Sequence, residues 1–131
     1  MLLGADTNII IRLVVEDDAE QLDRIGELLS EHELFVPLTV LLETEWVLRS
    51  RFQWSRADIA TTFAALIMLE GIFVEQASEI GWAIDRYAAA GEFADFVHVV
   101  ASRECQGFAT FDARLKRLAG SDSPVEVMDL P

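Results

Sequence analysis

The chain has 131 residues, of which 52% are hydrophobic, so it can bury the core of a single domain without disulfides or a structural metal. Its 23 acidic and 10 basic residues give a formal charge of −13, which opposes non-specific attraction to nucleic acid. A role on nucleic acid would need divalent cations held by clustered acids, or a basic partner chain. A simpler explanation of the negative charge is that the acidic residues only keep the protein soluble.

The sequence predicts neither a signal for export nor a segment that inserts into a membrane. No apolar run reaches the roughly 20 residues needed to cross a bilayer, and the first residues lack the basic segment of a secretory signal. Cys105 is the only cysteine, which excludes an internal disulfide. We therefore expect a cytoplasmic protein that does not engage membranes, with Cys105 as a buried apolar residue.

The first stretch of the chain predicts a buried strand that stops at Asp6. Residues 1–5 are apolar or small, and Asp6, Thr7 and Asn8 then predict the N-terminal cap of a helix that begins near Ile9. Asp6 would lie at the C-terminal end of a strand, where open α/β sheets bind their ligands.

Helices and strands alternate along the middle of the chain, to judge from the spacing of apolar residues and the capping residues. The predicted elements are a helix over 19–32 capped by the acidic turn Glu16–Asp18, a strand over 34–36, a helix over 39–51 capped by Thr39, a helix over 55–68 capped by Ser55, and a strand over 72–74.

The helix over 39–51 contains two acids that the helical wheel separates. Glu45 stands four residues before Arg49, the favourable order for a surface ion pair. Glu43 shares its side of the helix with Trp46 and Val47 and has no local cation, which is costly unless a charged group binds it. Glu43 is therefore the better functional candidate of the two.

Strands and helices are predicted to alternate to the end of the chain, and three acids lie where one predicted element ends or the next begins. Glu92 and Asp95 open a helix, where the helix dipole favours negative charge, and Asp112 directly follows a strand. The predicted elements are a helix capped by Ser78 that runs to about 90, a helix over 92–105 ended by Gly107, a strand over 108–111, a short basic helix over 113–119 and an edge strand over 125–128.

Such alternation, without a linker or a repeat, predicts one α/β domain over residues 1–131 with a mainly parallel sheet covered by helices on both faces. Right-handed crossovers bring the C-terminal ends of parallel strands to one edge of the sheet. We therefore expect Asp6 and Asp112 to share that edge.

Four acids are candidates for one shared site: Asp6, Glu43, Asp95 and Asp112. Carboxylates packed together repel each other unless they are partly protonated or hold divalent cations. Oxygen ligands without a set of cysteines or histidines favour Mg²⁺ or Mn²⁺ over zinc. From spacing alone an accidental arrangement is as good an explanation, because the chain has 23 acids.

Four segments of the chain each carry one of these acids: Asp6–Ile9, Leu41–Arg49, Gly91–His98 and Thr110–Asp112. In order and spacing they resemble the signatures of PIN-domain ribonucleases, and most closely the VapC toxins of VapBC type II toxin–antitoxin systems. The resemblance covers the chain from Leu2 to about Leu118.

The resemblance implies a three-layer α/β/α sandwich, usually dimeric, with an endoribonuclease site that depends on Mg²⁺ or Mn²⁺. Hydrolysis at such a site leaves 5′-phosphate and 3′-hydroxyl ends. Each candidate acid matches one of the family's catalytic, metal-binding acids: Asp6, Glu43, Asp95 and Asp112. Three further residues match supporting positions: Asn8, which helps to order the first acid, Thr110, whose hydroxyl bonds a carboxylate or the attacking water, and Glu92, often acidic in relatives.

The same resemblance implies two kinds of macromolecular partner. One is an RNA substrate, and the other is a cognate VapB-like antitoxin that wraps the toxin and inserts a basic side chain into the acidic site. Trp46, Trp54, Phe63 and Trp82 offer a dimer face and an antitoxin groove, although core packing explains each aromatic equally well.

RNA would be held by the few basic residues, and single-stranded loops are the plausible targets because A-form duplex hides its base edges. The densest basic cluster directly follows Asp112, where complementing the helix dipole is an equally good explanation. The candidates are Arg49, Arg114, Lys116 and Arg117, with Arg12 and Arg51 as further bases.

Other classes of enzyme and binding protein fit the sequence less well. A haloacid dehalogenase-type phosphatase needs a second aspartate where Asn8 stands, and a receiver domain needs a lysine after a late strand, whereas Lys116 is in a helix. No glycine-rich phosphate-binding loop is present. The open alternative is a non-catalytic PIN-like module that binds RNA or protein.

Overall fold

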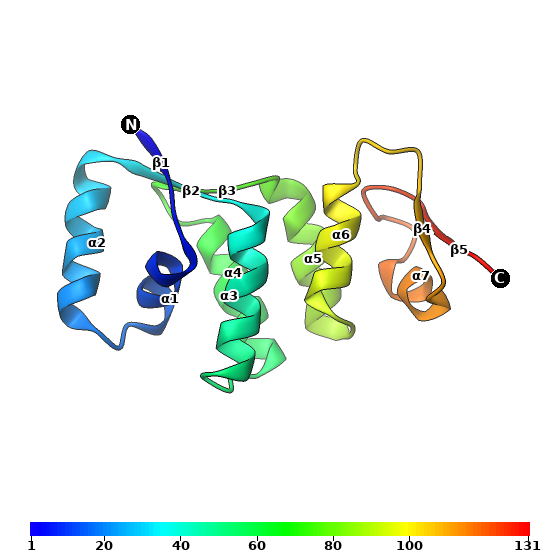
Figure 1. The fold of residues 1–131 in the computed structure, drawn as a ribbon, viewed down its shortest axis with the longest axis horizontal. Coiled ribbons are helices and arrows are strands. Elements are labelled where there is room, and N and C mark those ends of the chain that lie inside the picture. The colour runs from blue at the N-terminus through cyan, green and yellow to red at the C-terminus, as the bar shows by residue number, and fades with distance from the viewer. The chain divides into compact units, whose positions relative to one another are not determined.

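The computed structural model describes all residues, Met1–Pro131, and shows strands and helices in alternation (Figure 1). No helix is both long enough and apolar enough to cross a membrane. The elements in chain order are β1 (Leu2–Gly4), α1 (Thr7–Val15), α2 (Ala19–Glu31), β2 (Glu33–Val36), α3 (Leu38–Ser50), α4 (Arg56–Ile67), β3 (Ile72–Val74), α5 (Ala77–Ala89), α6 (Phe93–Ala101), β4 (Phe108–Thr110), α7 (Ala113–Ala119) and β5 (Val127–Asp129).

The chain forms two compact units, Met1–Glu75 and Gln76–Pro131. In the first unit the strands form a parallel sheet in the order β1-β2-β3, and in the second unit β4 pairs in parallel with β5. Parallel strands joined through helices confirm the predicted α/β class. The division of the strands into a three-stranded and a two-stranded sheet was not predicted.

The core of the first unit is built from the apolar faces of its helices and from β2. Packing of α1 against α3 is the contact that matters for the site, because it brings the residues after β1 next to the middle of α3. The most deeply buried side chains of this unit are those of Ile10, Ile11, Leu34, Val36, Leu41, Leu48, Ile59 and Phe63.

The core of the second unit lies where α5 packs against α6. Tyr87 meets Phe93 edge to face with ring centroids 5.2 Å apart, and Trp82 meets Phe96 in the same way at 5.8 Å. The turn between the helices needs Gly91, whose φ is +97°, because a Cβ there would come within 2.8 Å of Cζ of Phe96. This turn fixes how α6 begins, and so places the acids of its first turn.

Two of the predicted helix caps are wrong. The cap of α3 is Pro37, not Thr39, and the backbone N–H of Leu38 donates to Oε1 of Glu75 at 2.9 Å, an acceptor that the neighbouring sequence does not reveal. Helix α5 begins one residue before Ser78, after Gln76 in the left-handed conformation. The caps formed by Asp6, Asp18 and Ser55 are confirmed, because their side chains accept from amides three residues ahead.

The predicted ends of two other elements are also wrong. Helix α6 ends at Ala101 rather than near Cys105, because the next amides bond three residues back and the Ser102 hydroxyl bonds the His98 carbonyl. Cys105 therefore lies in a turn and is exposed, not buried as expected. The last strand, β5, begins at Val127 instead of Val125, since only Val127–Asp129 pairs with β4.

Candidate active site

Asp6 lies two residues after the last residue of β1 and caps α1, and the cap is the one that the sequence predicts. Its Oδ1 accepts a hydrogen bond from the backbone N–H of Ile9 at 3.2 Å, which fixes the carboxylate at the positive end of the helix. Its other carboxylate oxygen makes no hydrogen bond within the chain and remains open to a ligand. Asn8 makes no hydrogen bond to Asp6, so the amide of Ile9, not Asn8, orders this carboxylate.

Glu43, on α3, lies close to the segment that carries Asp6. The hydroxyl of Thr7 donates a hydrogen bond to Oε1 of Glu43, and Thr7 is the residue after Asp6. Asp6, Thr7, Asn8 and Glu43 line one hollow of about 400 Å³, and its remaining walls come from α3 and from Arg51. The structure thus brings together two of the four predicted acids, from segments far apart in the sequence.

Thr7 was not predicted as part of the site. The sequence held one signal: a hydroxyl directly after Asp6, in the first turn of a helix. Its partner could not be read, because Glu43 stands 36 residues later and only the packing of α1 against α3 brings the two side chains together.

The predicted environments of the two acids on α3 are reversed. Glu45 was expected at the surface, but it is only 4% exposed, whereas Glu43 is exposed. Glu45 lies on the helical face of Leu41 and Leu48, both in the core, and its Oε2 accepts from Nε of Arg49 at 2.8 Å. The ion pair with Arg49 is therefore confirmed, but its carboxylate is buried. This pair already engages Arg49, one of the predicted RNA contacts.

Asp95, in the first turn of α6, is half-buried beside other acids of the second unit. Burial is the main cause that raises the pKa of Asp95, and the negative charges of Asp112 and Glu92 raise it further, against the opposing effect of His98. Asp95 and Asp112 thus lie close enough to repel each other. A cation bound between them would remove that repulsion.

Asp112 joins β4 to α7 through a dense set of hydrogen bonds. Its Oδ1 accepts from the backbone N–H groups of Arg114 at 2.9 Å and Leu115 at 3.3 Å, so it caps the helix. Oγ1 of Thr110 accepts from the backbone N–H of Asp112 at 3.0 Å, so its O–H can still donate to a carboxylate or to water, the role that the resemblance implies. Thr110 therefore holds the turn that presents Asp112.

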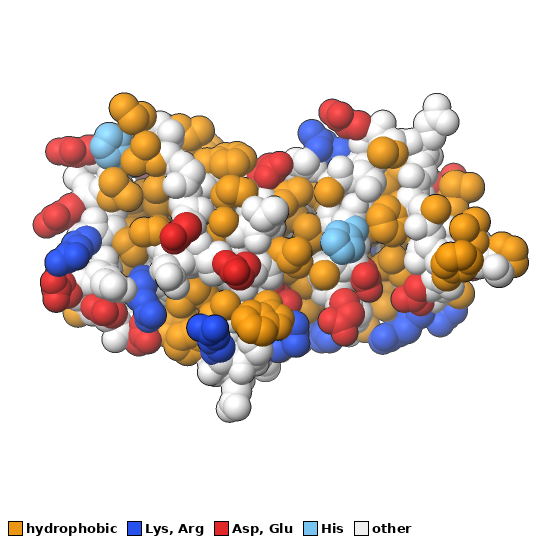
Figure 2. Space-filling model, in the orientation of Figure 1, with side chains coloured by type: hydrophobic (Ala, Val, Ile, Leu, Met, Phe, Trp, Pro, Cys, Tyr) orange, Lys and Arg blue, Asp and Glu red, His pale blue; other side chains and the backbone are white.

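The basic residues after Asp112 are only partly available to a ligand. Nζ of Lys116 lies 3.1 Å from Oδ1 of Asp129, and this hydrogen bond is the main cause that lowers the pKa of Asp129. Arg114 and Arg117 are exposed and form no ion pair within 4.0 Å. Figure 2 shows acidic and basic side chains on the visible surface of each unit.

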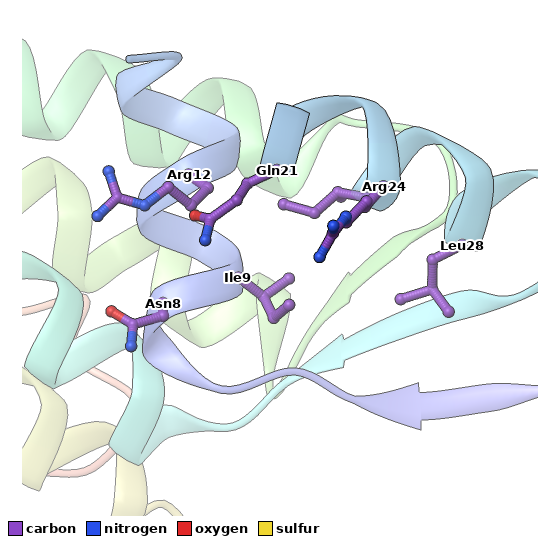
Figure 3. Close-up of a pocket in the computed structure, with 7 residues that line it drawn as sticks. Asn8, Ile9, Arg12, Gln21, Arg24 and Leu28 are labelled. Atoms are coloured by element: carbon purple, nitrogen blue, oxygen red, sulfur yellow. The ribbon is translucent and has the colours of Figure 1, made fainter. Parts of the chain in front are cut away.

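A second hollow, of about 320 Å³, lies between α1 and α2 (Figure 3). Its floor is apolar, and both of its arginines are in ion pairs, Arg12 with Asp17 at 2.5 Å and Arg24 with Glu20 at 2.8 Å. Asn8 lines this hollow as well as the one that contains Asp6 and Glu43. No acid among the four candidates lines it.

Comparison with known families finds a match to a family model described as the PIN domain, over residues 5–121. The chain belongs to the PIN domain family. The match crosses the boundary between the two compact units and includes all four candidate acids. PIN domains are generally nucleases and typically use divalent metals. No curated protein matches the chain.

The acids of this PIN domain suit such a metal by their chemistry. Asp6 and Glu43 supply carboxylates in one unit, and Asp95 and Asp112 in the other, and hard oxygen donors of this kind favour Mg²⁺ or Mn²⁺. Within either unit alone, no three side chains of His, Cys, Asp or Glu come together to hold a metal ion. Two observations fit a cation: the open oxygen of Asp6 and the mutual repulsion of Asp95 and Asp112.

Proposed function

We propose that this PIN domain is an endoribonuclease dependent on Mg²⁺ or Mn²⁺, with residues 1–131 acting as a single domain. The observation that carries the proposal is the pairing of Asp6 and Glu43 in one hollow, within a family whose members are generally nucleases. The acids Asp95 and Asp112, coupled in the second unit, would complete the catalytic set. The products would be RNA fragments with 5′-phosphate and 3′-hydroxyl ends.

Each residue of the proposed site would have a distinct role. Asp6, Glu43, Asp95 and Asp112 would hold the metal, which when bound lowers the pKa of water and offsets charge on the reacting phosphoryl group. Thr7 would orient the Glu43 carboxylate through the hydrogen bond that its hydroxyl donates to Oε1. Asp95, whose pKa is raised, is favoured as the acid that carries a proton when no cation is present.

The direct test is cleavage of a single-stranded RNA by the purified chain in Mg²⁺, Mn²⁺ and excess EDTA. We expect EDTA to abolish cleavage, and Asp6→Asn to lower its rate by about a hundredfold or more, as for removal of a group that stabilises a transition state. Asp23→Asn, an exposed acid on α2, is the matched control and should cleave normally. Equal cleavage in excess EDTA, or full activity of Asp6→Asn, would show that the assignment is wrong.

The chemistry of the products tests the mechanism separately. Hydrolysis by a water molecule does not need the 2′-hydroxyl as nucleophile, so a substrate with one deoxynucleotide at the cleaved position should still be cut. A 2′,3′-cyclic phosphate product would instead indicate attack by the 2′-hydroxyl. Binding of RNA without any cleavage, in metal, would point to the non-catalytic PIN-like module.

We further propose that the chain is a VapC-type toxin that acts in the cytoplasm, as a homodimer paired with a VapB-like antitoxin. The support for this proposal is that four segments of the chain resemble VapC toxins, and that each segment carries one of the four candidate acids. Expression of the wild-type chain should arrest growth, and Asp6→Asn should not. Relief of the arrest by the product of a small neighbouring reading frame would support the pairing, and growth at a normal rate would count against a toxin.

The predicted RNA contacts of the proposed enzyme remain Arg49, Arg114, Lys116 and Arg117. Arg114 and Arg117 are the stronger pair, since Arg49 and Lys116 are in ion pairs with Glu45 and Asp129. Loss of one phosphate contact to single-stranded RNA should reduce the salt dependence of binding by about 0.7 in the slope of log K against log salt. Arg114→Gln and Arg117→Gln should show this reduction.

A further inference from the structure

An exposed tryptophan stands beside the two acids of the first unit. Trp46 is three residues after Glu43 on α3, so the two side chains share a face of the helix. Trp46 lines the same hollow as Asp6 and Glu43 and is 50% exposed. Phe63, in contrast, is fully buried in the core of this unit. A large ring left half in water at the mouth of an acidic hollow is not explained by core packing.

An arginine that forms no ion pair, Arg51, lies next to this ring. The guanidinium of Arg51, the C-cap residue directly after α3, is 5.9 Å from the centroid of the Trp46 ring, within the range of a cation–π interaction. Arg12, Arg24 and Arg49 of the same unit are in ion pairs, whereas Arg51 has none. In a chain with 23 acids, this arginine keeps its hydrogen-bond donors free at the wall of the hollow.

We propose that Trp46 and Arg51 form a subsite for one nucleotide of single-stranded RNA, in which a base stacks on the exposed indole and Arg51 binds the adjoining phosphate. The inference rests on the proposed nuclease function, because it places the subsite in the hollow that contains Asp6 and Glu43. Bases stack on aromatic rings with little dependence on sequence, and arginine adds a planar set of donors that matches phosphate.

Charge favours RNA over a protein as the occupant. The cation of Arg51 supplies local attraction for phosphate where the net charge of −13 would otherwise repel it. The indole of Trp46 and the guanidinium of Arg51 are neighbours, as the base and the phosphate of one nucleotide are. Both line the hollow that contains Asp6 and Glu43, the acids that would act on the RNA backbone.

Binding and cleavage are measured separately to test the subsite. A ten-nucleotide oligoadenylate is titrated into the Asp112→Asn variant with Mg²⁺ present, so that RNA binds without being cut. We expect Trp46→Leu in this background to weaken binding about tenfold, and Trp46→Phe to weaken it much less, because stacking needs a ring and not merely an apolar side chain. Met68→Ala, an exposed apolar residue at the end of α4, should bind normally.

The salt dependence of binding tests the phosphate contact. Arg51→Gln should reduce the slope of log K against log salt by about 0.7, the value for one phosphate of a single strand. Arg24→Gln removes an exposed arginine that is already paired with Glu20 and should leave the slope unchanged. An unchanged slope in Arg51→Gln would remove the phosphate contact from the proposal.

The outcomes separate this inference from the proposed function. If Asp6→Asn is inactive but Trp46→Leu and Arg51→Gln bind and cleave like the wild type, the subsite is wrong and the nuclease stands. If the wild type binds oligoadenylate through Trp46 but never cleaves RNA, the nuclease is wrong and the subsite stands. If Trp46→Leu changes only the molar mass measured by light scattering, Trp46 is a protein contact and the subsite is overturned.

Discussion

The hydroxyl of Thr7 donates a hydrogen bond to Oε1 of Glu43 and so joins the first turn of α1 to the middle of α3. Because Asp6 is held by the amide of Ile9 in that same turn, the two carboxylates are positioned by one small structural unit. In the proposed metal site this hydroxyl would orient one of the carboxylate ligands, which is a common means of tuning a bound metal.

Removing the Thr7 hydroxyl should therefore damage activity more than stability. Thr7→Val keeps the volume of the side chain, and we expect a loss of about 10- to 100-fold in metal affinity or cleavage rate, with unfolding free energy lowered by about 1 kcal/mol. Thr7→Ser keeps the hydroxyl and should retain most of the activity and most of the stability of the wild type. Thr61→Val, at an exposed position of α4, is the control. Full cleavage by Thr7→Val would show that Glu43 needs no such support.

The raised pKa of Asp95 predicts a pH-dependent effect on stability. A carboxyl whose pKa is raised in the folded state favours folding below its ordinary value of 3.8, and this contribution is lost as pH rises through the raised pKa. Asp95→Asn should therefore raise the melting temperature at pH 7 in metal-free buffer, and the gain should vanish below about pH 3.8. Asp85→Asn, at an exposed position of α5, corrects for the loss of a helix-surface aspartate. A gain that is the same at both pH values would contradict the prediction.

Two ion pairs with the same spacing differ in burial and should differ in strength. Glu45–Arg49 and Glu20–Arg24 are both four residues apart on a helix with N···O distances of 2.8 Å, but the side chain of Glu45 is 5% exposed and that of Glu20 is 77% exposed. Arg49→Ala leaves a buried carboxylate without this partner, so we expect a loss of about 2 kcal/mol, less than for a fully buried pair because Arg49 is half exposed. Arg24→Ala should cost about 0.3 kcal/mol. Urea unfolding of both variants measures the difference, and equal losses would show that burial does not matter here.

Metal binding should stabilise the folded chain. A cation that binds only the folded state at 100 times its dissociation constant adds about 2.7 kcal/mol to the free energy of unfolding. We expect Mn²⁺ to raise the melting temperature of the wild type, with the rise reversed by EDTA and much reduced in Asp6→Asn and Glu43→Gln. Asp23→Asn should respond like the wild type. The same rise in all four proteins would place the bound metal elsewhere.

Local sequence predicted those features that local hydrogen bonds decide. Asp6, Asp18 and Ser55 cap their helices because each side chain reaches an amide three residues ahead, whatever the rest of the chain does. Where the deciding partner is distant, the prediction was wrong: α3 begins before Thr39, where Glu75 accepts from the backbone of Leu38. Cys105 is exposed because α6 stops earlier than its apolar run suggested.

The sequence by itself determined the alternation of strands and helices, the α/β class, and the positions of Asp6 and Asp112 between a strand and the helix that each of them caps. Tertiary structure decided which side of α3 turns inward, and with it the burial of Glu45 and the exposure of Glu43 and Trp46. A helical wheel gives only the angles between side chains. The packing of α1 against α3 sets the orientation of the helix, and it also brings Thr7 to Glu43.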